Sequence, residues 1–155
     1  PILALRIGGN DLLACLGLRW PLQHTIYQTP LGALIGQLVS NFMPHGYALT
    51  APVCEHFSAT DLLNTELALD MQHGLVGKTV IHPQQIGHVH AALQVSDSDY
   101  VAAKAILQPD ALAVFHHQGS MLEPATHKAW AERICQRASL YGVAEQKANF
   151  LQVLS

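Results

Sequence analysis

The sequence predicts an α/β fold in which parallel strands alternate with helices. Three apolar stretches of strand character, at 2–7, 47–53 and 75–81, are each followed at short spacing by a segment of helical periodicity. Such alternation is typical of a parallel sheet, either closed into a barrel or open. After about residue 95 the alternation stops and helical segments dominate. We therefore expect a sheet-bearing part, residues 1–95, and a helical extension, residues 96–155.

The first strand runs into a glycine turn that carries an acid. Asp11 follows the apolar run and the pair Gly8-Gly9, and the apolar segment 12–17 then begins a short helix or turn. The carboxyl ends of parallel strands are where α/β folds place their chemistry. A polar cap on the next helix explains the same residue, and the residues alone leave both explanations open. No dinucleotide-binding Gly-x-Gly-x-x-Gly pattern and no P-loop is present.

Helix-start and helix-stop residues flank the remaining elements. A cap residue followed by proline, or by an acid three residues later, is a usual start, and glycine after the last turn is a usual end. Thr29 before Pro30, Ser58 with Asp61, and Ser96 with Asp99 predict three of the helix starts, and Gly74 predicts the end of the helix that Ser58 begins. We expect helices over 31–42, 58–73, 83–93, 96–107, 125–140 and 144–154, and a short strand over 111–116 followed by a turn at 118–120.

The composition indicates a surface that is largely covered. Half of the residues are hydrophobic and 12% are charged, against about a quarter charged in ordinary soluble domains. We therefore expect that another chain covers much of the surface, as in a homo-oligomer, or that the chain is part of a larger fold. The chain opens at Pro1 already in strand-like sequence, which favours a fragment. The apolar edges of its outer strands would then pair with other sequence.

The composition also argues against several classes of protein. The net charge is −3, and only Arg6 and Arg19 are basic before Lys78, so the first half cannot form the basic face that nucleic acid requires. No apolar run approaches the ~20 residues of a membrane span, and no signal-peptide pattern opens the chain. Three widely spaced cysteines without a Cys-x-x-Cys pair indicate reduced thiols and a cytoplasmic protein.

Polar residues follow the second and third strands as Asp11 follows the first. Glu55 comes after the second strand, and His82-Pro83 ends the third. In a parallel sheet these positions share one edge, where ligand-contacting residues gather, and paired carboxylates there suit a hard cation such as Mg²⁺. A hydrogen bond to a loop backbone is the alternative for His82. The histidines lack converging zinc-ligand spacing, and no Ser-His-Asp order or Gly-x-Ser-x-Gly elbow is present.

Several patches, in order over nearly the whole chain, resemble the HpcH/HpaI aldolase and citrate lyase β-subunit family. They read Ile-Gly-Gly-Asn-Asp-Leu, Leu-Thr-Ala-Pro-Val-Cys-Glu, Gly-Lys-Thr-Val-Ile-His-Pro-Gln-Gln-Ile and Gln-Gly-Ser-Met-Leu-Glu-Pro, of which the third is the most specific. The resemblance implies a carbon–carbon lyase of the TIM-barrel fold, a (β/α)8 barrel of about twice this length. The three strands would be barrel strands six to eight, and the residues after Ser96 the family's C-terminal helical extension.

The resemblance also implies the chemistry. Family members cleave or form a carbon–carbon bond next to a carbonyl, on keto acids or CoA thioesters, through an enolate that a divalent metal, usually Mg²⁺, stabilises. Asp11 matches the metal-binding aspartate. The partner glutamate and the arginine that holds the carbonyl would lie upstream of Pro1, so we expect this chain alone to be inactive. Glu123 matches an acid that reaches a neighbouring subunit's active site and would act as general acid or base. The expected substrate- or cofactor-binding residues are Arg6, Glu55, His82 and Pro83.

Two alternatives stay open. Glu123 precedes Pro124, a good first residue for the helix at 125–140, and an acid is favoured there as N-cap by the helix dipole. For the chain as a whole, the alternative to a lyase is a non-catalytic, barrel-derived regulatory or oligomerisation module.

Overall fold

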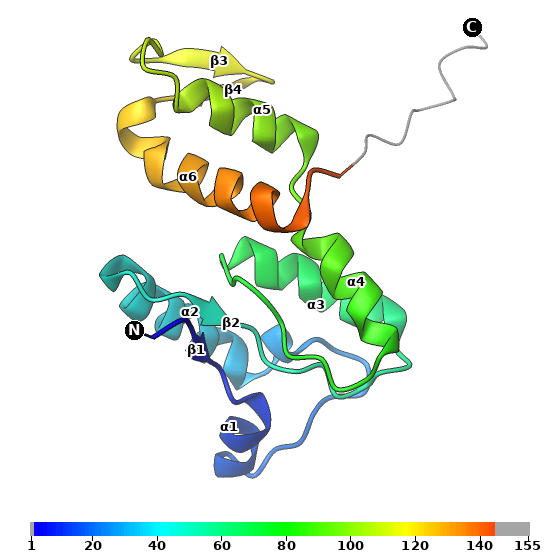
Figure 1. The fold of residues 1–155 in the computed structure, drawn as a ribbon. Coiled ribbons are helices and arrows are strands. Elements are labelled where there is room, and N and C mark those ends of the chain that lie inside the picture. Colours follow the sequence, from blue (N-terminus) through cyan, green and yellow to red (C-terminus); the bar gives the residue numbers. More distant parts are fainter. Residues whose placement is uncertain (1, 145–155) are drawn as a thin grey trace, which may run out of the picture. The chain divides into compact units, whose positions relative to one another are not determined.

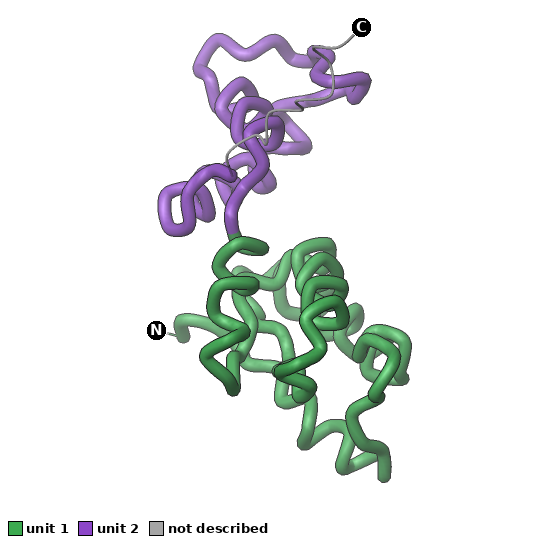
Figure 2. The backbone as a smooth tube through the Cα atoms, turned by 90° about the vertical axis from the view of Figure 1, so that its right-hand side faces the viewer, with its two compact units in different colours: residues 1–93 green, residues 94–155 purple. Residues whose placement is uncertain are grey.

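A computed structural model describes residues 2–144 (Figure 1). The chain divides into two compact units, Pro1–Leu93 and Gln94–Ser155 (Figure 2). The first carries a parallel strand pair with its helices, and the second carries an antiparallel hairpin packed with a helix pair. The helix expected over 144–154 lies almost wholly outside the described residues. Within 2–144, no helix is both long and apolar enough to cross a bilayer.

The strands of the first unit are parallel, as predicted, but short. β1 (Leu5–Arg6) pairs with β2 (Leu49–Thr50) in parallel register, and the third predicted strand contributes only a parallel bridge between Ala51 and Lys78. The ladder continues through the Ala51 N–H, which donates to the Gly77 carbonyl at 2.7 Å. The longer strands expected at 2–7, 47–53 and 75–81 are wrong in extent. Two features limit the strand length. Pro52 has no N–H to donate. Within residues 2–144, no further strand pairs with the outer edges of this short parallel sheet.

Helix starts follow the predicted signals at one position and not at another. The Thr29 hydroxyl accepts a hydrogen bond from the Leu31 N–H at 3.2 Å and so caps α2 (Pro30–Phe42) as predicted. The predicted start at Ser58 is wrong, because α3 (Thr60–Gln72) has Ala59 at its N-cap and no side-chain cap. Gly74, at φ +74°, ends that helix as expected. The helices are α1 (Gly9–Cys15), η1 (Ile26–Gln28), α2 (Pro30–Phe42), η2 (Met43–His45), α3 (Thr60–Gln72) and α4 (Gln84–Leu93).

One face of the short sheet packs against the helices and forms the core of the first unit. Alternate residues of a strand point to opposite faces, so Ile7 and Leu49 turn inward while Arg6 stays exposed. Leu31 and Ile35, one turn apart on α2, are fully buried against them. The buried apolar residues of this core are Ile7, Leu13, Trp20, Ile26, Leu31, Ile35, Leu49, Ala51 and Leu75.

Lys78 carries a charge into the interior of the first unit. Its Nζ lies 3.2 Å from Glu66 Oε2 and 3.0 Å from Asp70 Oδ2, and all three side chains are at most 1% exposed. The two acids stand one turn apart on the buried face of α3. The Ile26 N–H donates to Glu66 Oε1 at 2.8 Å, and the Tyr27 hydroxyl donates to Asp70 Oδ1. This Lys78 cluster, Lys78 with Glu66, Asp70 and Tyr27, therefore joins α3, η1 and the third strand segment.

The second unit is a helix pair with a hairpin. Ser96 caps α5 (Asp97–Ile106) as predicted, its hydroxyl accepting from the Asp99 N–H at 3.0 Å. α5 packs along α6 (Pro124–Tyr141), the long helix expected from about residue 125. The buried apolar residues between them are Val95, Ala102, Ala103, Ile106, Leu122, Ala131 and Ile134.

The hairpin comprises β3 (Phe115–His117) and β4 (Ser120–Leu122), paired antiparallel. Its two loop residues, Gln118 and Gly119, have φ of +46° and +79°, the left-handed pair that a type I′ turn requires. The strand predicted over 111–116 is wrong in extent, because β3 covers only Phe115–His117. The turn predicted at 118–120 is found at Gln118 and Gly119, while Ser120 already begins β4. β4 was not predicted, because it is too short to show an alternating pattern.

Replacing Lys78 by Met tests the importance of the buried cluster. The variant leaves two carboxylates buried without their cation, so we expect a loss of about 3–5 kcal/mol in the free energy of unfolding. Urea unfolding followed by circular dichroism measures the loss. Lys128→Met is the matched control, because Lys128 pairs with Glu132 on the surface at 4.0 Å, and exposed pairs contribute under about 1 kcal/mol. Equal effects of the two substitutions would contradict the role given to the cluster.

Candidate functional site

Asp11 lies where the sequence predicted it, directly after β1 in the first turn of α1. The N-cap of α1 is Gly8, and Asp11 makes no capping hydrogen bond, so the cap explanation for this acid is wrong. Gly8 leaves room for the carboxylate, since a Cβ there would lie 2.8 Å from Asp11 Oδ2. At Gly9 a Cβ would lie 2.9 Å from the Trp20 ring. The two glycines thus allow α1 to begin close to the sheet and present its acid, exposed, at the strand end.

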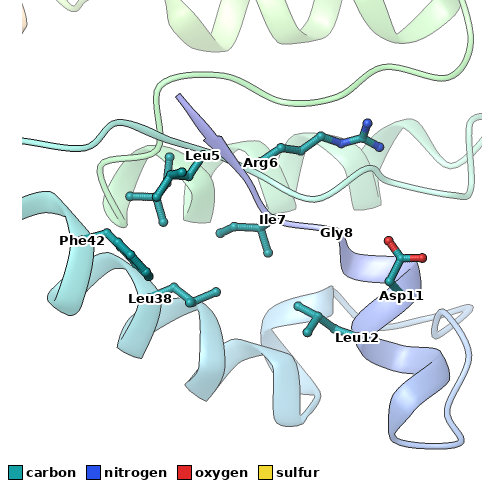
Figure 3. Close-up of a pocket in the computed structure, with 9 residues that line it drawn as sticks. Leu5, Arg6, Ile7, Gly8, Asp11, Leu12, Leu38 and Phe42 are labelled. Carbon is teal, nitrogen blue, oxygen red and sulfur yellow. The ribbon is translucent and has the colours of Figure 1, made fainter. Parts of the chain in front are cut away.

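Arg6 and Asp11 both lie near the end of β1 and border one pocket. In Figure 3 the Arg6 side chain extends to the side of the strand on which the Asp11 carboxylate lies, while Leu5 and Ile7 extend to the other. Both charged residues border a pocket whose walls are otherwise mainly aliphatic and aromatic. A guanidinium and a carboxylate beside one strand end can orient an anionic ligand and a cation, respectively.

Glu55 and His82 lie on the loops that follow β2 and the third strand segment. Glu55 is exposed, and Pro83 is exposed beside a half-buried His82. The His82 ring stacks on Phe57 with centroids 4.5 Å apart and planes at 21°, and its Nδ1 accepts from the Gln84 N–H at 3.3 Å. The structure therefore shows the loop-backbone hydrogen bond that was the alternative for His82. In the neutral ring this leaves the proton on Nε2, free to donate. Glu55, His82 and Pro83 do not line the pocket beside Asp11.

Gln85 connects the same two loops and was missed from the sequence. Its side chain is 1% exposed, and its Nε2 donates to the Cys54 carbonyl at 2.8 Å. Its Oε1 accepts from the Ile81 N–H at 3.0 Å. A buried amide that bonds to both backbones fixes the spacing of the loops carrying Glu55 and His82.

The perturbed ionisable groups belong to the Lys78 cluster and to Cys54 beside it. Burial raises the pKa of Asp70, although the Lys78 ammonium opposes the rise. Burial, then the charge of Asp70, raises the pKa of Tyr27. Burial and the neighbouring Glu66 raise the pKa of the Cys54 thiol to about 11, so this cysteine is no ready nucleophile at neutral pH. The sequence signal for the cluster was the pair of acids four residues apart among buried leucines of α3.

Asp11 fits a hard cation as one ligand of several. Among residues 2–144, no three or more His, Cys, Asp or Glu side chains gather in an arrangement that could hold a metal. Mg²⁺ commonly binds proteins through one or two carboxylates and completes its shell with waters and substrate oxygens. An exposed carboxylate at a strand end has the donor chemistry for that role.

Glu123 occupies the N-cap position of α6, in the second unit, but its carboxylate caps no backbone N–H. The Glu123 N–H donates instead to His127 Nδ1 at 3.1 Å, and the nearest polar partner of the carboxylate is the Thr126 hydroxyl at 3.5 Å. The structure thus leaves this half-buried acid weakly engaged. It lies in a different unit from Asp11, and its predicted catalytic role stays a prediction.

Comparisons with known proteins agree with this architecture. A family model described as carbon–carbon bond lyases of the TIM-barrel fold matches residues 1–143. No curated protein matches the sequence. Among solved structures, the chain is similar to CitE from Mycobacterium tuberculosis in complex with magnesium, acetoacetate and coenzyme A, at 22% identity and a TM-score of 0.69, over 90% of this chain and 53% of that one. It is also similar to a citrate lyase from Burkholderia xenovorans LB400, at 17% identity and a TM-score of 0.66, over 94% of this chain and 48% of that one. The chain therefore spans about half the length of these structures.

The raised pKa of Cys54 predicts a loss of stability at alkaline pH. Above the ordinary thiol pKa of about 9 the unfolded chain releases this proton, whereas the folded chain keeps it up to about 11, so rising pH in this window favours unfolding. The free energy of unfolding of wild type should therefore fall by about 1–2 kcal/mol more than that of Cys54→Ala when the pH is raised from 8 to 10.5. Urea titrations at both pH values measure this difference. Cys15→Ala, at an exposed thiol, should show none.

The two N-cap residues of the second unit should differ in their effect on stability. Ser96→Ala removes a cap hydrogen bond and should cost about 1 kcal/mol. Glu123→Ala removes a carboxylate that caps no N–H, so it should change the free energy of unfolding by less than about 0.5 kcal/mol. Thermal unfolding of both variants decides this. A larger loss for Glu123→Ala would restore the capping explanation and weaken the catalytic one.

Proposed function

The chain belongs to the family of carbon–carbon bond lyases of the TIM-barrel fold, and on that premise we propose that it forms the part of a lyase active site that carries Asp11. The predicted fold class, part of a TIM barrel followed by a helical extension, is confirmed by the same match and by the two structural likenesses. The proposed reaction cleaves or forms a carbon–carbon bond next to a carbonyl of a small keto acid or an acyl-CoA. The observation that carries the proposal is the exposed Asp11 carboxylate at the carboxyl end of β1.

In this proposal Asp11 is a ligand for Mg²⁺. The support is its exposed carboxylate, the room that Gly8 leaves beside it, and the magnesium in the complex of the similar CitE. When bound, the cation would supply positive charge beside the carbonyl oxygen on which negative charge develops. The remaining ligands are waters, substrate oxygens and groups outside residues 2–144, because the described side chains offer no group of three.

Arg6, Glu55, His82 and Pro83 are proposed to contact substrate or cofactor. Arg6 extends on the Asp11 side of β1 and offers paired donors to a carboxylate or phosphate. His82, held by Phe57 and by the Gln84 N–H, offers its Nε2–H as a donor in a fixed direction. The coenzyme A bound to the similar CitE supports an acyl thioester as one class of substrate.

Glu123 is proposed as a general acid or base that acts in the active site of a neighbouring subunit of a homo-oligomer. Its support is a carboxylate that the local structure does not use for capping. Proton transfer by a positioned carboxyl typically contributes ~10²–10⁴-fold to rate. The role requires an oligomer whose symmetry brings α6 to the strand ends of another copy.

Mn²⁺, a paramagnetic substitute for Mg²⁺, tests the role of Asp11. In ¹H–¹⁵N spectra of the 155-residue chain, we expect Mn²⁺ to broaden the amide signals of residues 8–12, and excess Mg²⁺ to restore them. Asp11→Asn should abolish the broadening there. Asp61→Asn is the matched control, because Asp61 is also exposed in the first turn of a helix and should leave it unchanged.

Unchanged broadening in Asp11→Asn, or equal broadening around Asp61, would contradict the metal assignment. That result would favour the non-catalytic, barrel-derived module, since the family match would then stand without its metal ligand.

A further inference from the structure

The loop between α1 and η1 forms a recess of its own in the first unit (Figure 1). The recess has a volume of about 440 Å³, and its lining residues are Arg19, Trp20, Pro21, Leu22, Gln23 and His24. It shares none of them with the pocket beside Asp11. A ligand in this recess is therefore independent of the metal position proposed at Asp11.

Hydrogen bonds and packing hold this loop in place. The His56 ring donates from Nε2 to the Pro21 carbonyl at 2.8 Å, since a carbonyl oxygen can only accept. Where the loop enters η1, the Thr25 N–H donates to Gln28 Oε1 at 3.0 Å. Trp20 is 2% exposed and anchors the loop in the core of the first unit. The recess is therefore part of the folded unit and needs no closing motion to form.

The polar lining of the recess consists of hydrogen-bond donors without an acid. Arg19, Gln23 and His24 are exposed and line it together. Between Asp11 and Glu55 the sequence carries no Asp or Glu. A guanidinium and an imidazole without a neighbouring carboxylate favour the binding of an anion.

The indole of Trp20 adds an unused donor to the wall of the recess. In the part of the chain that the structure describes, its buried Nε1 has no hydrogen-bond partner. A Cβ at Gly9 would lie 2.9 Å from Cζ3 and 3.2 Å from Cη2, which are on the opposite edge of the indole from Nε1. The indole N–H therefore points away from Gly9 and the start of α1. Because buried N–H groups are nearly always paired, this one indicates an acceptor outside the described residues.

We propose that this recess binds the phosphate group of an organic phosphate. The Arg19 guanidinium offers paired N–H donors to two phosphate oxygens. The Gln23 amide, the His24 imidazole and the Trp20 indole offer further donors from other residues of the loop. A tetrahedral phosphate accepts hydrogen bonds from several directions, whereas a carboxylate accepts them in one plane, so phosphate makes fuller use of this set.

The apolar part of the recess indicates that the phosphate is attached to an organic group. Leu22 is 72% exposed, and Pro21 and the Trp20 ring line the recess beside it. An organic group packed on these side chains removes apolar surface from water, which a free anion cannot do. We therefore expect a phosphate monoester to bind more tightly than inorganic phosphate.

Titration of the ¹⁵N-labelled 155-residue chain with inorganic phosphate and with phenyl phosphate, at constant ionic strength, tests the proposal. Each tryptophan gives one indole N–H signal, so Trp20 reports on the recess and Trp130, in the second unit, is the internal reference. We expect a saturable shift of the Trp20 signal with both probes and none of the Trp130 signal. The midpoint for phenyl phosphate should be about tenfold lower than that for inorganic phosphate.

Two arginine variants separate a specific site from general attraction of anions. Arg19→Gln should weaken the binding of both probes about tenfold, because a charge-assisted hydrogen bond is lost. Arg133→Gln is the matched control, at an exposed arginine of α6, and should leave both midpoints unchanged.

An unshifted Trp20 signal, or equal effects of the two arginine variants, would overturn the site. Acetate that shifts the Trp20 signal at the same concentration as inorganic phosphate would overturn the assignment to phosphate, and equal midpoints for the two phosphate probes would overturn the organic group. Asp11→Asn should leave the titrations unchanged, so failure of the metal assignment and failure of this site are separate results.

Discussion

The buried pairing of one ammonium with two carboxylates is the interaction on which the first unit depends. Moving such charges out of water costs several kcal/mol per ion, and only close, fully bonded geometry offsets that cost. Lys78 therefore needs both Glu66 and Asp70, and these need the Ile26 N–H and the Tyr27 hydroxyl. The third strand segment, α3 and η1 are fixed relative to one another because none can move without leaving a buried charge unpaired.

The candidate site lies on exposed polar residues supported by this interior. Lys78 forms a parallel β-bridge with Ala51, which follows β2. The Gln85 side chain then joins the two loops that follow, because it bonds to the Cys54 carbonyl and to the Ile81 N–H. After β1, the pair Gly8-Gly9 lets α1 begin close to the sheet. Rigid packing behind short loops is what holds a carboxylate, a guanidinium and an imidazole at defined positions without burying them.

Local sequence signals predicted local features well. The Ile-Gly-Gly-Asn-Asp stretch placed Asp11 at a strand end, and Thr29 and Ser96 marked helix starts, because each depends on neighbours a few residues away. Strand lengths could not be predicted, since pairing depends on segments about 40 residues apart that must also have partners on both sides. The Lys78 cluster was missed for the same reason, because its members are far apart in the sequence. Tyr27 and Asp70, which share a hydrogen bond, are separated by 43 residues. Ser58 shows the opposite error, a capping pattern that the folded chain does not use.

We propose that Asp11 offers its carboxylate to a divalent cation at the end of β1. Anomalous diffraction from crystals of the chain soaked in Mn²⁺ tests it most directly, because the peak locates the ion independently of the protein phases. We expect a peak about 2.0–2.2 Å from an Asp11 carboxylate oxygen, with waters completing the shell. A crystal whose peaks lie only at other acids, with Asp11 accessible and unoccupied, would contradict the claim.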